Sequence, residues 1–337
     1  MVLKSKRMKT YNLILGVDVS KLTLDISCAK RSLHIKIEND SKGFSKFKTW
    51  CRTNKIHLSE TMVVMEHTGG YEYRFIQFCE SVSLHYCRIS GLEIKRSMGI
   101  TRGKNDKVDS YRIGLYGEEK IARLKPSKPL DQNILTLKQL LSFRKRLVRE
   151  NAGLSATIKE RQHIYETGAK DAVVRIANLK IRANANHISQ IEKEIDHLIK
   201  SSDSLSKSYR ILTSVKGIGP INALMTIAYT ENFISFTDPR KYAVYVGVVP
   251  FDNSSGTSIK GKKMVSYIAN KELKQELNQA AKSAVTHDPE LRAYAQRKME
   301  NKHYKIVLNN VKFKLILRMF AVIKRGELYT KDFRTAA

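Results

Sequence analysis

The sequence is poor in the residues that typify secreted and membrane proteins. Its 337 residues include only four cysteines, none of them in a Cys-X-X-Cys pair. This usage supports neither a disulfide framework nor a zinc site. No apolar run approaches the ~18 residues that a membrane span requires, and the basic start of the chain lacks the apolar stretch of a signal peptide. We therefore expect a cytoplasmic protein with no membrane partner.

Acidic residues are also scarce. There are 32 Asp and Glu against 61 Lys and Arg, which leaves a net charge of +29. The excess is spread along the chain and is not confined to one tail, so it favours a polyanionic partner, with nucleic acid first. A merely solvated basic surface is the alternative. The single tryptophan argues against an aromatic platform for single strands.

The first third of the chain has the pattern of an α/β domain. Three strand-like segments open it, and helical and strand-like segments then alternate, which predicts a mixed sheet. A helix from Asp106 to about Ile121 would close the domain. The predicted strands cover residues 11–17, 22–29, 32–38, 61–65 and 83–89, and the predicted helices cover 42–54 and a segment with Tyr73, Ile76 and Phe78.

The remainder reads as helical. Pro126 and Pro129 mark a boundary, and from residue 130 to 200 there is no proline but two long amphipathic patterns, typical of an antiparallel hairpin or a coiled-coil arm. The polar stretch 201–208 is predicted to be a linker, and a mostly helical unit follows. The predicted domains are 1–125, 126–208 and 209–330.

Four acids occupy positions from which they could meet. Asp18 and Glu66 follow apolar strands, and Asp106 and Asp109 lie three residues apart at a helix start. Strand ends and the adjacent helix start converge at one edge of such a sheet. Clustered carboxylates select Mg²⁺ or Mn²⁺, and two such ions would activate a nucleophile for phosphodiester chemistry.

Each acid also has a structural interpretation when taken alone. Asp18 could cap a turn, Glu66 could be a solvated strand end, and Asp106 could be a helix N-cap. Two further acids are expected to lie outside the cluster. Asp25 is predicted to face outward from its strand, and Glu72 to lie on a helix surface.

The segment Val215–Ala223 (VKGIGPINA) is a glycine-rich turn between two predicted helices. It resembles the hairpin of helix-hairpin-helix modules, in which backbone N–H groups and a helix N-terminus contact a phosphate. Lys216, Gly217 and Gly219 would make that contact. An ordinary helix–helix turn is the alternative.

The segment Gly247–Lys263 (GVVPFDNSSGTSIKGKK) is read as a strand that reaches Pro250, followed by a polar loop. Its hydroxyls, with Lys260, Lys262 and Lys263, favour contact with phosphate, and spacing alone makes a catalytic serine the less favoured interpretation. The loop contains no histidine, and the chain has neither a nucleophile elbow nor a P-loop. An amphipathic helix over 265–283 and a basic helical surface over 292–325 are expected after it.

Taken in order, these motifs resemble a known family. GVDVSK around Asp18, MEHTGGYEY around Glu66, RGKNDKVDS around Asp106, then KGIGP and VPFDNSSGTSIKGK are similar to the DEDD transposases of bacterial insertion sequences, relatives of the Piv and MooV invertases. The resemblance runs from about Tyr11 to Tyr329.

The resemblance implies an α/β plus α architecture: an RNase H-like (RuvC-like) N-terminal domain, a dimerising coiled-coil arm and a mostly helical C-terminal domain. It implies that Asp18, Glu66, Asp106 and Asp109 bind Mg²⁺ (or Mn²⁺), and that a serine attacks DNA to form a covalent phosphoserine. Ser255 matches best, with Ser254 in reserve. It further implies guidance by an element-encoded RNA and dimers that pair into a tetramer, acting on nucleoid DNA. Lys104 and Lys107 are the expected nucleic-acid contacts beside the acids.

Three other functions are compatible with parts of the pattern. A RuvC-like junction nuclease would use water as its nucleophile and need no serine. An actin-like ATPase or kinase would need a second phosphate hairpin and an adenosine motif, and the sequence has neither. A non-catalytic nucleic-acid-binding protein would be indicated if the four acids failed to converge.

Overall fold

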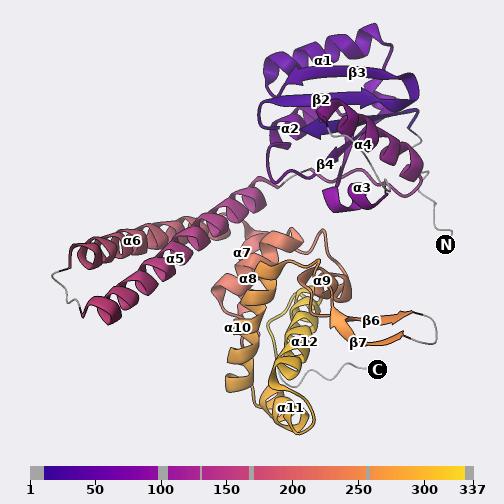
Figure 1. The fold of residues 1–337 in the computed structure, drawn as a ribbon. Coiled ribbons are helices and arrows are strands. Elements are labelled where there is room, and N and C mark those ends of the chain that lie inside the picture. Colours follow the sequence, from indigo (N-terminus) through magenta and orange to yellow (C-terminus); the bar gives the residue numbers. More distant parts are fainter. Residues whose placement is uncertain (1–10, 98–104, 130, 167–170, 256–258, 331–337) are drawn as a thin grey trace. The chain divides into compact units, whose positions relative to one another are not determined.

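The structure is a computed structural model that divides into two compact units, Met1–Pro129 and Leu130–Ala337, each considered by itself (Figure 1). Side chains are described for all placed residues except 253–260 and 262. The described backbone covers residues 11–97, 105–129, 131–166, 171–255 and 259–330.

The first unit is built on a five-stranded mixed sheet with the order β3-β2-β1-β4-β5. The first three strands are antiparallel neighbours, whereas β4 runs parallel to β1 and β5 runs parallel to β4. The predicted mixed α/β unit is confirmed. The strands are β1 (Leu13–Val19), β2 (Thr23–Cys28), β3 (Leu33–Glu38), β4 (Thr61–Glu66) and β5 (His85–Ile89).

In the described part of this unit four α-helices accompany the sheet, and helix α4 lies against β1, β2 and β4. Helices α1 and α2 carry four phenylalanines whose rings pack on one another, with centroids 5.0–6.0 Å apart. These rings account for the helical pattern of aromatic residues in the sequence. The helices are α1 (Ser41–Thr53), α2 (Tyr73–Ser81), α3 (Gly91–Ser97) and α4 (Asp106–Lys120).

Helix α4 approaches the sheet unusually closely, at a glycine pair. Gly16 of β1 faces Gly114 of α4, and a Cβ on Gly16 would clash with the backbone of Gly114 and Ser110. Beside this contact the hydroxyls of Ser27 and Ser110 hydrogen-bond at 2.7 Å in the buried interior. The glycines therefore fix the distance between α4 and the strand that carries Asp18.

The second unit is mostly helical, as predicted. Two long helices, α5 (Gln132–Tyr165) and α6 (Ala172–Lys200), pack side by side (Figure 1), and their base shares one apolar core with the helices that follow. We call this helix pair the arm. The remaining elements are α7 (Asp203–Thr213), α8 (Pro220–Thr230), α9 (Pro239–Val246), β6 (Pro250–Ser255), β7 (Ile259–Val265), α10 (Lys271–His287), α11 (Pro289–Met299) and α12 (Tyr304–Arg325).

Three local predictions in this unit differ from the structure. Most of the polar stretch 201–208 is helical, because α7 begins at Asp203. The strand expected to end at Pro250 begins there instead. The helix expected over 265–283 begins only at Lys271, where the Asn270 side chain accepts a hydrogen bond from the Leu273 N–H and caps it. Among the described helices, none is both long and apolar enough to cross a bilayer.

The glycine pair yields a matched test of stability. Gly16→Ala should lower the free energy of unfolding by about 2 kcal/mol or more, because the strand and α4 must separate to admit the methyl group. Gly114→Ala, on the opposite side of the same contact, meets neighbours at 3.5 Å or more and should be neutral or stabilising by up to about 1 kcal/mol. Urea unfolding of both variants checks this, and an equal loss in both would contradict it.

Candidate active site

The alternation of side chains along β1 and β4 sends two acids toward α4. Asp18 shares a strand face with Gly16, the residue that touches α4. Glu66 shares a face with Val64, which packs in the core beneath α4. Because β4 is the parallel neighbour of β1, both carboxylates emerge at the same end of the sheet and on the same face.

The other two predicted acids lie in the first turn of α4. The Asn105 side chain accepts a hydrogen bond from the Val108 N–H at 2.8 Å and caps the helix, so the alternative role of Asp106 as N-cap is wrong. Asp106 is largely exposed and lies 3.8 Å from Lys36, and Asp109 lies 3.4 Å from the guanidinium of Arg112. The helix start thus presents two carboxylates beside the strand ends.

The electrostatics of Asp18 show that the four acids lie close enough to interact. Burial raises the pKa of Asp18 to about 6, and the charges of Asp106, Asp109, Glu66 and Asp25 add to the rise, in that order. The neighbouring carboxylates thus disfavour the ionised form of Asp18. Such a group favours the approach of a cation.

Asp25 is a fifth acid at this site, and its predicted outward orientation is wrong. It pairs with Asp18 across β1 and β2, so both side chains point to the same face, and it is only 4% exposed. His34 lies 2.9 Å from one carboxylate oxygen and Lys36 lies 3.3 Å from the other. Lys36 also lies 3.8 Å from Asp106, so one ammonium group joins Asp25 to a predicted site acid.

Two features hold Glu66 and the turn after it. A Cβ on Gly91 would clash with the Glu66 carboxylate, so the side chain lies against bare backbone at that point. Glu72, predicted on a helix surface, is instead only 3% exposed. It accepts hydrogen bonds from Thr68 at 2.6 Å and from the Gly70 N–H at 2.9 Å. Burial alone would raise the pKa of Glu72, but these hydrogen bonds lower it below its usual value.

The carboxylates are not already arranged as a closed ligand set. Within the part of the chain that the structure describes, no three Asp, Glu, His or Cys side chains surround a single point at coordinating distance. The donor chemistry still fits a hard divalent cation, because the predicted tetrad consists only of carboxylates and these raise the pKa of Asp18.

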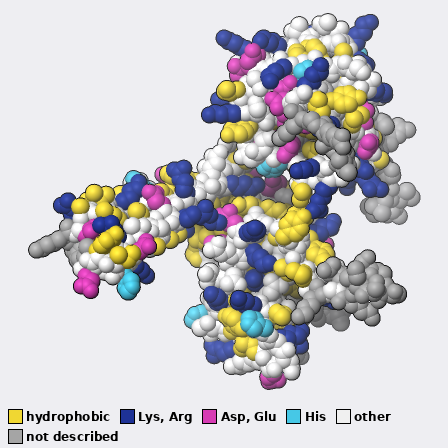
Figure 2. All heavy atoms as spheres, in the orientation of Figure 1, with side chains coloured by type: hydrophobic (Ala, Val, Ile, Leu, Met, Phe, Trp, Pro, Cys, Tyr) yellow, Lys and Arg dark blue, Asp and Glu magenta, His cyan; other side chains and the backbone are white. Residues whose placement is uncertain are grey.

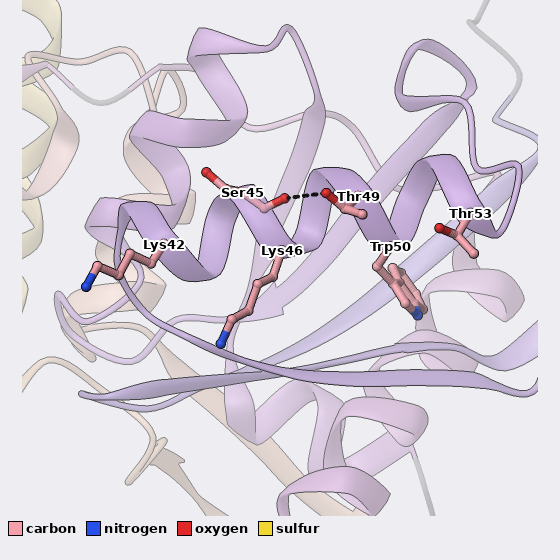
Figure 3. Close-up of a pocket in the computed structure, with 6 residues that line it drawn as sticks. All are labelled: Lys42, Ser45, Lys46, Thr49, Trp50 and Thr53. Carbon is pink, nitrogen blue, oxygen red and sulfur yellow. Dashed lines mark hydrogen bonds between the residues drawn. The ribbon is translucent and has the colours of Figure 1, made fainter.

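Among the described residues of the first unit, shallow hollows lie beside α4 and along α1. One borders the start of α4 and is lined by Lys107, His34 and Tyr111 among others, so a predicted nucleic-acid contact lies in it; Lys104 falls outside the described residues. The other follows α1 past Lys46 and Trp50 (Figure 3) and contains no predicted site residue. Lys46 is bound there by Glu38 at 2.9 Å.

The glycine-rich turn joins α7 to α8. Gly217 has φ +93° and packs against Ala280 and Ala284 of α10, where a Cβ would clash. Gly219 is the N-cap of α8 and has open space in front of it, with Lys216 exposed nearby. The turn therefore presents an accessible helix N-terminus, as a phosphate contact requires.

The predicted serine segment is a β-hairpin. Ser255 is the last residue of β6 and lies opposite Ile259, and Ser254 lies opposite Lys260. Residues 256–258 and the side chains of Ser254, Ser255, Lys260 and Lys262 are outside the described part. Lys263 is paired with Asp252 at 2.7 Å. Ser255 is thus carried at the far end of a two-stranded ribbon.

Comparison with known proteins gives matches to transposase families and to proteins of the transposase and insertion-element type. A family model described as a transposase, of the DEDD type, matches residues 15–162, and that of the transposase IS116/IS110/IS902 family matches residues 209–296. A putative transposase y4pF/y4sB of Sinorhizobium fredii is 24% identical over 219 residues, 59% of this chain and 55% of that protein. An uncharacterized 43.6 kDa protein of insertion element IS110 from Streptomyces coelicolor is 28% identical over 165 residues, 48% of this chain and 39% of that protein. The matches thus span about half or less of these relatives.

The raised pKa of Asp18 predicts a pH-dependent effect of Asp18→Asn. Ionised Asp18 destabilises the folded chain, fully above about pH 6 and not at all below its unfolded pKa of 3.8. In EDTA at pH 7.5 the variant should be more stable than wild type by about 1 kcal/mol, after allowance for solvent screening, and the gain should vanish by pH 4. Urea unfolding from pH 4 to 8 measures it.

Glu119→Gln, an exposed change on α4, is the control and should show no such window. A gain for Asp18→Asn that is independent of pH would contradict the electrostatic explanation.

Proposed function

The chain belongs to the IS110-type DEDD transposases, and we propose that it cuts and rejoins the DNA of an insertion element with a metal-binding carboxylate tetrad and a serine nucleophile. The observation that carries the proposal is the placement of Asp18 and Glu66 at one end of the sheet, beside the helix start that bears Asp106 and Asp109. In this proposal the mixed sheet is that of an RNase H-like, RuvC-like unit.

Asp18, Glu66, Asp106 and Asp109 would hold Mg²⁺ or Mn²⁺. Burial and the neighbouring carboxylates disfavour ionised Asp18 in the folded chain, a bound cation would offset this cost, and carboxylate oxygens are the ligands these ions prefer. When bound, such ions stabilise charge on the oxygens of a phosphodiester and activate a nucleophile. Lys36, between Asp25 and Asp106, already supplies one positive charge at the edge of the group.

Ser255 would be the nucleophile, with Ser254 in reserve. Its Oγ forms a bond to phosphorus as the bond from phosphorus to the leaving sugar oxygen breaks, and the serine proton passes to that oxygen. The phosphoserine conserves the energy of the broken ester, so the strand can be rejoined by the reverse attack of another sugar hydroxyl. A place at the end of a ribbon suits a group that must reach into DNA.

The proposed partners are DNA and a guide RNA encoded by the element. Lysine and arginine side chains are scattered over the visible faces of both units (Figure 2), in keeping with the net charge of +29. The proposed contacts beside the tetrad are Lys104 and Lys107. In the second unit the proposed contacts are Lys216, Gly217, Gly219, Lys260, Lys262 and Lys263.

The arm is proposed to dimerise the chain, as a first step toward a tetramer. One seam joins α5 to α6 and includes a buried Asn184 that hydrogen-bonds to Asn151 at 2.8 Å. Near the α5–α6 turn the apolar side chains Ile164, Ile176 and Leu179 are 58–62% exposed. Exposed apolar residues gathered in this way are typical of an interaction surface, and a second copy of the arm would cover them.

The competing function is a RuvC-like junction nuclease in which water attacks the phosphodiester. It shares the tetrad and the basic surface, and differs in leaving no protein–DNA bond. The second family model, which covers the serine hairpin, favours the transposase.

Covalent trapping separates the two. Wild type incubated with element-end DNA, the element's RNA and Mg²⁺, then denatured, should give a DNA-shifted protein band. Ser255→Ala and Asp18→Ala should reduce that band by more than about 1,000-fold, because each removes a group the step requires. Ser254→Ala is the matched control and should keep it.

A band lost in Ser254→Ala and kept in Ser255→Ala would identify Ser254 as the nucleophile in place of Ser255. DNA cleavage without any covalent band, unchanged in both serine variants, would replace the transposase mechanism with hydrolysis.

Dimerisation through the arm has its own test. Placing two charges on its exposed apolar surface, in Ile176→Lys/Leu179→Lys, should weaken self-association at least about tenfold, because the charges would have to be desolvated at the interface. Sedimentation velocity across a concentration series measures this. Asn178→Lys, an exposed change between the two sites, should have little effect. Unchanged association in the double variant would place the dimer contact elsewhere.

A further inference from the structure

Lys312 is a charged residue in the apolar core of the second unit. It is only 5% exposed, and one helical turn to either side along α12 lie Leu308 and Ile316, which are 3% and 0% exposed. Both belong to the continuous core that joins α12 to α10 and α8. An ammonium group in such surroundings is strongly unfavourable unless an opposite charge lies beside it.

No such opposite charge is found among the described residues. Lysines in far more open positions are paired, for example Lys145 with Glu272 at 2.8 Å and Lys200 with Asp196 at 2.6 Å. For Lys312 the described part of the chain offers neither an ion pair nor a hydrogen bond. The acid in the first turn of the neighbouring α10, Glu272, is already bound by Lys145.

The charged group that most affects the pKa of Lys312 is another lysine, Lys274. Helix α10 packs against α12, and Lys274, in the first turns of α10, is partly buried. Burial lowers the pKa of Lys312 to about 8, and the charge of Lys274 adds to this; burial likewise lowers the pKa of Lys274. The two lysines thus lie on helices that pack together, and among the described residues no acid neutralises either charge.

This region lies at the base of the serine hairpin. Asn309, one turn before Lys312, donates a hydrogen bond from Nδ2 to the Val248 carbonyl at 2.6 Å, two residues before β6 begins. Asn270, one turn before Lys274, donates from its N–H to the Tyr245 carbonyl at 2.9 Å. The two helices that carry the lysines are thus tied to the segment that leads into β6.

We propose that Lys312 and Lys274 form a binding site for a backbone phosphate of the DNA strand that the serine hairpin engages. The phosphate would supply the negative charge that the fold lacks at this point, and the two ammonium groups would hold it as point charges. Ser255 lies five positions along the strand from Pro250, about 17 Å, so the site would hold a phosphate of the same DNA strand other than the reacting one. The inference rests on the proposed DNA substrate.

The purely structural alternative makes a different prediction. If Lys312 merely fills space in the core, Lys312→Met removes an unfavourable charge and changes nothing else. If Lys312 holds a phosphate, the same substitution stabilises the free protein and weakens DNA binding. Stability and binding then move in opposite directions, which a misfolded variant cannot imitate.

The test compares Lys312→Met with Lys282→Met, which removes an exposed lysine from α10 and the same charge. Affinity for element-end duplex DNA is measured from 50 to 300 mM salt, with thermal unfolding of each free protein at pH 7. Lys312→Met should raise the unfolding midpoint, lower DNA affinity about tenfold and reduce the slope of log affinity against log salt by about one. Lys282→Met should change affinity less than about twofold.

Equal DNA affinity in wild type and Lys312→Met would overturn the phosphate site while leaving the proposed function intact. Failure of wild type itself to bind the DNA would instead remove the proposed function. A parallel series with single-stranded RNA of the same length identifies the ligand: loss of RNA affinity alone would assign the lysines to RNA and overturn the proposal.

Discussion

The close approach of α4 to β1 determines how far the acids at the start of the helix lie from those at the ends of the strands. Gly16 has no side chain, so the helix backbone rests on the strand, and the hydrogen bond between Ser27 and Ser110 adds a polar contact beside it. Two residues farther along β1 is Asp18, and the first turn of α4 carries Asp106 and Asp109. A bulkier contact would move the helix outward and separate these acids. Packing in the core thus sets the electrostatics at the edge of the sheet.

The two units share one physical feature: each concentrates like charge where the fold offers too little compensation. In the first unit burial and the neighbouring carboxylates raise the pKa of Asp18, while Lys36 and Arg112 lie beside other acids of the group. In the second, Lys312 is buried with no acid near it among the described residues. Such arrangements lower the stability of the free protein. Under the proposed function, the missing charges would arrive with a metal ion and with DNA.

Much of the first unit could be predicted from sequence because its strands are short apolar runs separated by clear turns. Asp25 could not be placed in this way. Its strand, TLDISC, alternates polar and apolar residues, which favours an acid that faces outward, but the polar face of the strand lies against α4 and is buried. Only the pairing register, with Asp25 opposite Asp18, shows that the Asp25 side chain lies on the same face as the site. The prediction that Glu72 lies on a helix surface was wrong because its hydrogen-bond partners, Thr68 and Gly70, belong to the turn before the helix.

The serine hairpin was harder still, because its strands lack the residues that favour strands. PFDNSS and IKGKKMV are polar and contain glycine, asparagine and serine, so nothing in them predicts pairing. The ribbon has only two strands, and the register shifts between Phe251 and Asn253. A ribbon of this composition derives little stability from its own side chains, so its position depends on its base, where Asn309 holds Val248 and Asn270 holds Tyr245. Residues outside the serine motif therefore position the hairpin that carries Ser255. The spacing of the motif alone cannot identify these residues.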